Sequence, residues 1–431
     1  MSAEQLLSDR NLPSEVISQK VDALRSEMTC FLQEFVRHRS LPGHEQSVQA
    51  FISAKLRTLG LDVSILESVR SELEAHPAFC DDEIRFGERL NVIGRWSGSG
   101  HEESRTLILN GHVDVVPVGN ETLWRFPPWD GVVEEGRLHG RGSCDMKSGI
   151  TAAIFACQAL KELGFKPAHS LILETVVGEE SGGVGTLTTL VKGIRAAAAI
   201  IMEPTKLQIC PVQSGALSFR IRVAGRAIHA SMKILGVSAI EKFYLIFHAL
   251  EDLDRARHAR YRNSLFEFPD NVAPICVGTL RSGEWPSTVP DELIAEGRFG
   301  IFPGEPLAEA RAEFEACIQA CSQADEWLAK HPPVIEWFEG QFESSETSVN
   351  EPIAKTLAAC HGSVTGKSAG VYGAPYGSDQ RLFTNHGYMP TVLYGPGDVA
   401  LAHTVEEYVP LDEVFTCAKV LAHVVLLWCG S

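Results

Sequence analysis

Residues 106–117 read TLILNGHVDVVP, a largely apolar run that ends in a histidine and an aspartate two positions apart. Two similar runs follow at 170–180 (SLILETVVGEE) and 196–205 (AAAAIIMEPT). Between the first two lies the nearly all-apolar segment 146–163 (MKSGITAAIFACQALKEL), which predicts a buried helix. Apolar strands that alternate with helices are typical of an α/β sheet covered by helices on both faces.

The two ends of the chain extend this α/β pattern. Apolar residues keep helical spacing at 17–35 and again at 48–60. After the middle of the chain, the same pattern resumes with a helix at 350–364, a strand at 391–395 and a closing helix at 411–428. The flanking segments therefore belong to the same sheet-and-helix domain.

The pattern changes after Gln213. Residues 217–223 (LSFRIRV) alternate between apolar and polar side chains, as a strand with one face in water does. The order β-α-β-β-α-β that begins with this strand is that of the ferredoxin-like unit. The elements that follow it are predicted at 238–254, 273–280, 292–302, 306–328 and 333–337.

The length of 431 residues exceeds what one hydrophobic core usually holds, so two domains are expected. We predict an α/β domain formed by residues 1–212 and 339–431, with a mixed sheet and helices on both of its faces. The ferredoxin-like (βαββαβ) domain is predicted at 213–338, as an insertion into it.

Charge and composition exclude some classes of partner. The formal net charge of −17 argues against nucleic acid and against an anionic membrane surface. No apolar run reaches the roughly 18 residues that a membrane span needs, and residues 1–16 lack the pattern of a signal peptide. The eleven cysteines are scattered without a C-x-x-C pair, as in a cytoplasmic protein with reduced thiols.

One histidine and several carboxylates follow the predicted strands. In doubly wound sheets, ligands bind beyond the carboxyl ends of the strands. Crowded carboxylates repel one another and are costly to bury without a partner, so a cation is expected among them, and their number suggests two. Histidine and carboxylate ligands favour Zn²⁺ first, with Co²⁺ or Mn²⁺ as alternatives. The residues are His112, Asp114, Glu179, Glu180 and Glu203, together with Asp145 just before the buried helix.

Each of these short motifs, taken alone, favours a structural role for its residues. His112 and Asp114 alone would be the polar end of a strand, and Glu179 and Glu180 alone would be a solvated loop. Cys144, beside Asp145, is interpreted as a small packing residue. Only the order of these motifs along the chain, taken together, indicates a metal site.

Eight motifs in this chain resemble a known enzyme family, and together they cover nearly the whole sequence. The family is that of the two-metal deacylases and exopeptidases, which includes acetylornithine deacetylase, succinyl-diaminopimelate desuccinylase and carboxypeptidase G. The order of the motifs is specific for the family and does not identify the substrate. They are GHVDVVP (111–117), WDGVVEEGRLHGRGSCDMKSG (129–149), VVGEESGG (176–183), MEPT (202–205), GRAIHAS (225–231), VPDELIAEGRFGIFPGE (289–305), YGSDQRLF (376–383) and YGPGDVALAHTVEEYV (394–409).

The resemblance implies a role for each residue of the predicted centre. Asp145 would bridge two divalent metal ions. His112 and Glu203 would complete one metal site, and Glu180 and His403 would complete the other. His403 is identified by the resemblance alone, because a lone histidine is usually structural.

Two further roles and one backbone feature follow from the resemblance. Glu179 would be the general base and acid. Asp114 would hydrogen-bond the far nitrogen of His112 and fix its tautomer. The peptide bond after Asp145 would be cis, which is rare when the next residue is not proline.

The inserted domain and the segment after it supply the expected substrate contacts. His229, in GRAIHAS, would stabilise the oxyanion, either from the partner subunit or on domain closure. Arg298 would bind a substrate carboxylate, and Gly377 and Ser378 would bind an acyl or carboxylate end. The chain departs from the family at Ser287, where the family often has asparagine, so that contact stays open.

We therefore predict a metal-dependent hydrolase of linear amides, with a catalytic α/β domain and a homodimer formed through the lid domain. The substrate would be a small N-acyl amino acid or a related N-acyl or N-formyl amine, attacked by a metal-bridging hydroxide. Segment 71–92 resembles members that act on acetylated or formylated amines, including formylaminopyrimidine deformylase. A dipeptidase or carboxypeptidase at the same site, and a non-catalytic metal- or ligand-binding protein, are the alternatives.

Overall fold

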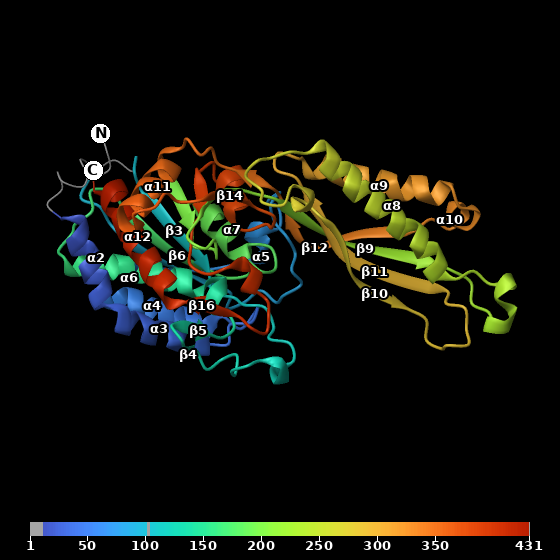
Figure 1. Cartoon of the computed structure of the whole chain (residues 1–431), viewed down its shortest axis with the longest axis horizontal. Coiled ribbons are helices and arrows are strands. Elements are labelled where there is room, and N and C mark those ends of the chain that lie inside the picture. The colour runs from blue at the N-terminus through green and yellow to red at the C-terminus, as the bar shows by residue number, and fades with distance from the viewer. Residues whose placement is uncertain (1–11, 101–103, 431) are drawn as a thin grey trace. The chain divides into compact units, whose positions relative to one another are not determined.

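The computed structural model describes residues 12–100 and 104–430 and divides the chain into two compact units (Figure 1). The first unit comprises Met1–Pro211, Thr347–Tyr372 and Ser378–Ser431. The second unit comprises Val212–Glu346 and Gly373–Gly377. Residues 1–11 of the N-terminal segment that lacks the pattern of a signal peptide lie outside the described residues.

The larger sheet is mixed and has nine strands among the described residues. Their order is β1 (Asp62–Glu67), β2 (Leu90–Trp96), β6 (Leu171–Val176), β3 (Leu107–His112), β7 (Ala198–Ile201), β15 (Thr391–Leu393), β8 (Ile209–Gln213) and β13 (Ser345–Glu346), with β14 (Val371–Ala374) beside β8. The central strands β6, β3, β7 and β15 pair in parallel, whereas β1, β2 and β6 pair in antiparallel fashion. The predicted mixed α/β sheet is confirmed.

Helices cover this sheet. The helix predicted from its apolar sequence, α6, is buried from Ser148 to Leu160, because α12, α2 and α3 pack against it in addition to β3. α11 begins at Pro352 and ends at Thr365, and the Gly366 that follows has a φ of +70°, a left-handed conformation that glycine adopts without strain. The described helices of the first unit are α2 (Ser14–Ala23), α3 (Arg25–Arg37), α4 (Gln46–Thr58), α5 (Arg70–Leu73), α6 (Ser148–Glu162), α7 (Val184–Val191), α11 (Pro352–Thr365) and α12 (Leu411–Cys429).

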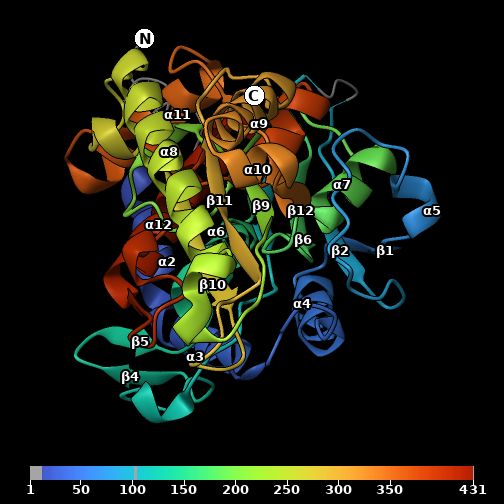
Figure 2. The ribbon, with the colours of Figure 1, turned by 90° about the vertical axis from the view of Figure 1, so that its right-hand side faces the viewer.

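The second unit has the β-α-β-β-α-β order that the sequence predicts. Its four-stranded antiparallel sheet has the order β10 (Ile275–Ser282), β11 (Glu292–Ile301), β9 (Gly215–Ala224) and β12 (Val334–Phe342). The helices α8 (Ala239–Arg260) and α9 (Leu307–Gln323), followed by the short α10 (Glu326–Lys330), lie on one face of this sheet (Figure 1, Figure 2). The domain boundary placed at 338/339 falls inside β12, and the unit continues to Glu346.

A small sheet links two distant parts of the first unit. It has the order β16 (Tyr408–Pro410), β5 (Arg137–His139) and β4 (Val132–Glu134). Tyr408 pairs with His139, which brings segment 403–410 beside the loop that precedes α6. Short helical turns complete the described chain at η1 (Glu121–Leu123), η2 (Ser143–Lys147), η3 (Ala230–Leu235), η4 (Pro269–Asn271), η5 (Leu382–His386) and η6 (Val399–Leu401).

Two further observations bear on the protein's setting. Within residues 12–100 and 104–430, no helix is both long enough and apolar enough to cross a membrane. None of the eleven cysteines, all of which lie within the described residues, forms a disulfide.

Candidate metal centre

The parallel strands β6, β3 and β7 end at the same edge of the sheet, and the predicted site residues follow them. His112 is the last residue of β3. Glu179 and Glu180 lie in the loop after β6, and Glu203 follows β7 by two residues. All residues of these three strands are buried. The packing of their apolar side chains therefore determines the positions of the polar residues at the strand ends.

The structure brings the predicted ligands together in two groups that share Asp145. In the first group, ligand atoms of His112, Asp145 and Glu203 lie within 4.8 Å of one another. In the second group, ligand atoms of Asp145, Glu180 and His403 lie within the same distance. We call these groups the first and second triads.

Direct contacts within the triads converge on Asp145. Its Oδ1 atom lies 3.0 Å from His112 Nε2, and its Oδ2 atom lies 3.5 Å from His403 Nε2. His403 Nε2 also lies 3.1 Å from an oxygen of Glu180. Each oxygen of Asp145 therefore faces one histidine, as a carboxylate shared by two sites would.

The electrostatics of the triads fit metal ions. Burial, together with the negative charge of Asp145, raises the pKa of Glu203 to about 8, and burial raises the pKa of Glu180. Hydrogen bonds to Asp145 and Glu180 raise the pKa of His403 to about 10. Oε1 of Glu203 is buried and has no hydrogen-bond partner among the residues that the structure describes. A buried acceptor in a group of carboxylates that repel one another suits a divalent cation.

The donor atoms are also of the right kind. Two imidazole nitrogens and three carboxylates form a mixed nitrogen and oxygen set, which Zn²⁺, Co²⁺ and Mn²⁺ all accept. The residues present thus fit the metal centre that the sequence predicts.

The loop before α6 presents Asp145 to both triads. Gly142 has a φ of +78°, and a Cβ atom there would lie 2.6 Å from a methyl group of Val115, so the turn requires glycine. The peptide bond between Asp145 and Met146 is cis, as predicted.

Asp114 does not make the contact that was predicted for it. Nδ1 of His112 lies 2.9 Å from the backbone carbonyl of Asp114, whereas the Asp114 carboxylate is 3.8 Å from that nitrogen. Because a carbonyl only accepts hydrogen bonds, Nδ1 carries the proton in this contact and Nε2 faces Asp145. The tautomer of His112 is thus fixed by the backbone.

The Asp114 carboxylate instead holds the loop after β6. Its two oxygens accept the backbone N–H groups of Gly178 at 2.8 Å, Glu179 at 3.4 Å and Glu180 at 3.1 Å. Those three donors occupy the carboxylate, which is the physical reason why it does not turn towards His112. Asp114 therefore positions the loop that carries Glu179 and Glu180.

Glu179 lies beside the triads without belonging to either. Its side chain is buried, and its Oε2 atom lies 4.0 Å from His112 Nε2. Burial raises its pKa well above the usual value for a carboxyl group. A buried carboxyl group at this place is suited to receive and return a proton.

The residues expected to contact substrate are divided between the two units. Arg298, on β11, donates from Nη2 to the carbonyl of Pro375 at 3.0 Å. His229 is exposed, precedes the turn η3, and contacts Ser231 Oγ at 2.8 Å through Nδ1. Gly377 is the last residue of the second unit, whereas Ser378 is buried in the first.

Two buried acidic residues near the centre were not predicted as functional. Asp379, read from the sequence as a possible turn residue, accepts a hydrogen bond from Thr186 Oγ1 at 2.5 Å. Glu407 accepts the backbone N–H of Asp145 at 3.2 Å. The sequence signals for Glu407 are its place in the motif at 394–409 and its position just before the strand-like pair Tyr408 and Val409.

Similar proteins of known sequence include a deformylase and a deacetylase. The N-formyl-4-amino-5-aminomethyl-2-methylpyrimidine deformylase of Halalkalibacterium halodurans is 29% identical over 357 residues, which cover 79% of this chain and 83% of that protein. The acetylornithine deacetylase of Myxococcus xanthus is 25% identical over 405 residues, which cover 91% and 99% of the two chains.

Solved structures show the same fold at low identity. Human carnosine dipeptidase 1 superposes with a TM-score of 0.75 at 15% identity, covering 96% of this chain and 98% of that chain. The M20 family metallo-carboxypeptidase Sso-CP2 from Sulfolobus solfataricus superposes with a TM-score of 0.73 at 17% identity, covering 93% and 99%.

The family model for peptidase family M20/M25/M40 matches residues 108–427. This range contains every residue of both triads, and the match confirms the family resemblance that the motifs indicate. The chain therefore belongs to peptidase family M20/M25/M40 and is a metal-dependent hydrolase of amide bonds.

Proposed function

We propose that this hydrolase is a deacylase that removes a small acyl or formyl group from an amino acid or a related amine. The observation that carries the proposal is the pair of triads with the buried carboxyl group of Glu179 beside them. The similarity to a deformylase and a deacetylase supports the substrate class. The complete set of ligands and base disfavours a non-catalytic binding protein.

A dipeptidase or carboxypeptidase using the same centre is the second candidate. Two solved structures of the same fold bear such names. Their identity of 15% and 17% to this chain supports the fold alone, so this candidate ranks below the deacylase.

Two Zn²⁺ ions, with Co²⁺ or Mn²⁺ as alternatives, are proposed as the cofactors. His112 and Glu203 would hold one ion, Glu180 and His403 the other, and Asp145 would contact both. Bound divalent ions would acidify a water molecule and polarise the acyl carbonyl.

The remaining steps fall to the protein's own side chains. Glu179 takes a proton from the attacking water and returns it to the amine that leaves. Asp114 keeps Glu179 in place through the backbone N–H groups of the loop, and the Asp114 carbonyl keeps Nε2 of His112 free to bind. The net reaction adds one water molecule across the amide bond and yields a carboxylate and an amine.

Residues of the second unit are also proposed to contact the substrate. His229 would stabilise the oxyanion, as a partner-subunit residue or after domain closure. Arg298 would bind a substrate carboxylate, and Gly377 and Ser378 would bind the acyl end. The bond from Arg298 to Pro375 supports this grouping, because Pro375 is only two residues from Gly377.

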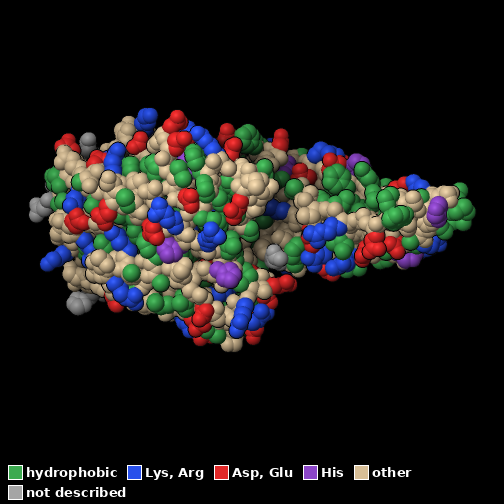
Figure 3. Space-filling model, turned by 90° about the horizontal axis from the view of Figure 1, so that it is seen from below, with side chains coloured by type: hydrophobic (Ala, Val, Ile, Leu, Met, Phe, Trp, Pro, Cys, Tyr) green, Lys and Arg blue, Asp and Glu red, His purple; other side chains and the backbone are tan. Residues whose placement is uncertain are grey.

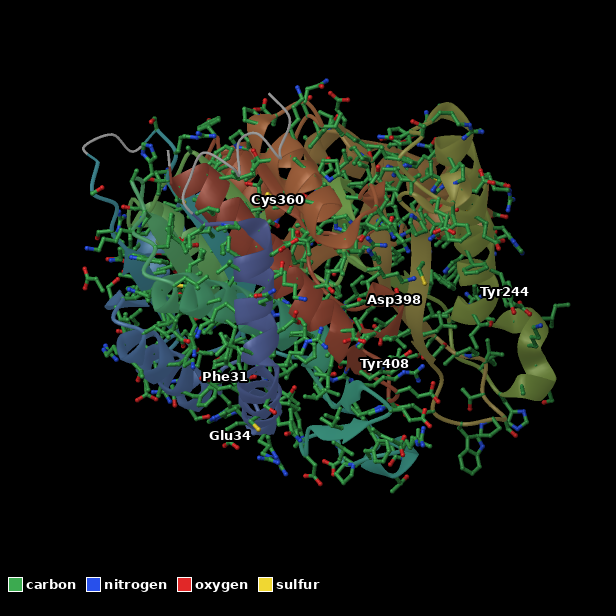
Figure 4. All side chains as sticks on the ribbon, turned by 60° about the vertical axis from the view of Figure 1, so that its left-hand side comes forward. Phe31, Glu34, Tyr244, Cys360, Asp398 and Tyr408 are labelled. Carbon is green, nitrogen blue, oxygen red and sulfur yellow. The ribbon has the colours of Figure 1, made fainter. Side chains whose placement is uncertain are left out.

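A homodimer through the second unit, in its role as lid or dimerisation domain, is part of the proposal. α8 exposes the side chains of Ile240, Tyr244 and Leu245, and Figure 4 shows Tyr244 on this helix. The edge strand β10 offers unpaired backbone groups to a second copy. Size-exclusion chromatography with light scattering measures the mass of the protein in solution. A monomeric mass at micromolar concentration would contradict the proposed homodimer.

The setting proposed for the enzyme is the cytoplasm, with a small molecule as substrate. The lack of disulfides among the cysteines that the structure describes supports a reducing compartment. Acidic and basic side chains are interspersed on the face that Figure 3 shows, which suits neither nucleic acid nor an anionic membrane.

The test combines metal removal with a substrate panel. Dialysis against a chelator should abolish hydrolysis, and Zn²⁺ or Co²⁺ should restore it. N-formyl, N-acetyl and N-succinyl amines should then be hydrolysed faster than dipeptides. Full activity in the chelated protein would refute the metal centre, whereas faster cleavage of dipeptides would replace the deacylase with the second candidate.

A further inference from the structure

Glu407 is a buried carboxylate that the proposed chemistry does not use. It is 1% exposed and lies one residue before β16. Its Oε1 atom accepts the backbone N–H of Cys144 at 3.0 Å and that of Asp145 at 3.2 Å. A single side-chain oxygen thus holds two consecutive backbone N–H groups at the residue shared by both triads.

The other oxygen of Glu407 is paired with a buried arginine. Arg141 Nη1 lies 2.5 Å from Glu407 Oε2. Arg141 is itself held by the carbonyl of Pro117, at 3.3 Å from its Nη2 atom, and its guanidinium lies over the ring of Trp124 at 5.1 Å. The carboxylate is therefore fixed on the side that faces away from Asp145 as well.

The backbone places Glu407 where these contacts form. Its carbonyl accepts the N–H of Gly140 at 3.0 Å, and the following residue, Tyr408, pairs with His139 of β5. Figure 4 shows Tyr408 beside the hairpin of β4 and β5. His403, which contacts the carboxylate of Asp145, lies four residues before Glu407 on the same segment. One short segment thus contacts both the side chain and the backbone of Asp145.

A buried ion pair of this kind adds little net stability, because removing two charges from water costs about as much as their attraction returns. It does fix geometry, since an arginine and two N–H groups around one carboxylate leave few alternative positions for it. The arrangement therefore fixes the geometry of the loop and contributes less to its stability.

We propose that Glu407, fixed by Arg141, is a positioning residue that holds the backbone of Cys144 and Asp145 so that the Asp145 carboxylate faces both triads at once. The inference rests on the proposed role of Asp145 as the shared ligand. Because Asp145 belongs to both triads, a loss at Glu407 weakens both metal sites together.

The variant Glu407→Gln tests the proposal. Glutamine has nearly the same shape and keeps one oxygen for the two N–H groups, but its amide N–H₂ then meets the guanidinium of Arg141, donor against donor. Co²⁺ titrated into the metal-free protein is the probe, and its visible absorption reports both affinity and ligand geometry. The expected result is a loss of about 10–100-fold in affinity at both sites, a changed Co²⁺ spectrum, and a lower kcat with KM nearly unchanged.

The neighbouring residue provides a matched control. Glu406 is exposed, and Glu406→Gln makes the same chemical change one position away. It should bind two Co²⁺ ions with the spectrum and affinity of the unaltered enzyme. A purely structural role for Glu407 would lower the unfolding temperature of the metal-free protein and leave the Co²⁺ spectrum of the folded variant as it was.

The outcomes separate this inference from the proposed function. Two Co²⁺ ions bound to Glu407→Gln with unaltered affinity, spectrum and kcat would overturn the inference and leave the metal centre intact. Failure of the unaltered enzyme to bind Co²⁺, or tight binding of both ions by Asp145→Ala, would instead refute the proposed centre. If Glu407→Gln does not fold, Glu407→Asp, which keeps the charge but withdraws it by one methylene, decides by the same titration.

Discussion

The second unit buries apolar side chains between its sheet and helices, with Phe219, Phe299 and Phe314 all fully buried. The first unit buries ionisable groups where β3, β6 and β7 end, among them His112, Glu179 and Glu203. An apolar core stabilises a fold in proportion to its area, whereas buried carboxylates oppose folding unless protons or cations compensate them. Substitutions in the apolar core of the second unit are therefore expected to change stability, whereas substitutions among the buried ionisable groups of the first unit are expected to change metal binding and rate.

The largest effect is expected at the shared ligand. Asp145→Ala should remove both metal ions, because each triad loses a ligand, and should abolish hydrolysis. Metal content after gel filtration measures this directly. Glu203→Ala is the matched control, since it alters only the first triad and should leave one ion bound. Equal losses in the two variants would contradict the shared role of Asp145.

A large effect on rate, without loss of metal, is expected for Glu179→Gln. The side chain keeps its shape but no longer accepts a proton, so kcat should fall about 10²–10⁴-fold. Both metal ions should remain, because Glu179 belongs to neither triad. The measurement is kcat alongside metal content, and a kcat near that of the unaltered enzyme would show that another group is the base.

A substitution in the core of the second unit is expected to change stability and to leave metal binding unchanged. Phe314→Ala should lower the free energy of unfolding by about 3–5 kcal/mol, because it leaves a cavity in an apolar core. Trp337, whose ring lies 5.2 Å from that of Phe314, is a natural fluorescence probe for denaturant unfolding. Metal affinity of the folded variant should not change. A parallel loss of metal affinity would mean that the two units do not respond separately.

The smallest of these effects is expected at Asp114. Asp114→Asn keeps one accepting oxygen but places an N–H₂ group against the N–H groups of the loop after β6. The variant should bind both ions, with kcat/KM lowered about 10–100-fold. If Asp114→Asn instead lost both metal ions, as is expected of Asp145→Ala, Asp114 would have to be counted among the metal ligands.

The sequence predicts the two-unit plan and most of the candidate centre because both depend on local patterns. Apolar strands followed by polar residues locate His112, Glu180 and Glu203, and strict alternation at 217–223 marks the change to the second unit. His403 follows Glu203 by two hundred residues, so no local pattern connects them, and only the family motifs brought His403 into the set.

The sequence does not reveal which backbone N–H groups the side chains bind. The carboxylate of Asp114 was assigned to His112, yet it binds the N–H groups of the loop after β6. Glu407 looks like a solvated residue beside Glu406, and its burial depends on the pairing of β16 with β5. Backbone N–H groups are present at nearly every position, so which of them a side chain binds is decided only by the fold.

The position of β15 in the larger sheet bears on how the protein is synthesised. β15 lies between β7 and β8, although nearly the whole second unit separates it from them along the chain. The ribosome therefore releases residues 212–346 while the middle of that sheet is still open and Asp145 still lacks His403. The second unit can begin to fold as the chain emerges, whereas the exposed edge of β7 is a place where a stalled chain would aggregate. With His403 as a proposed ligand, we expect the growing chain to lack a complete metal centre until residue 403 has left the ribosome.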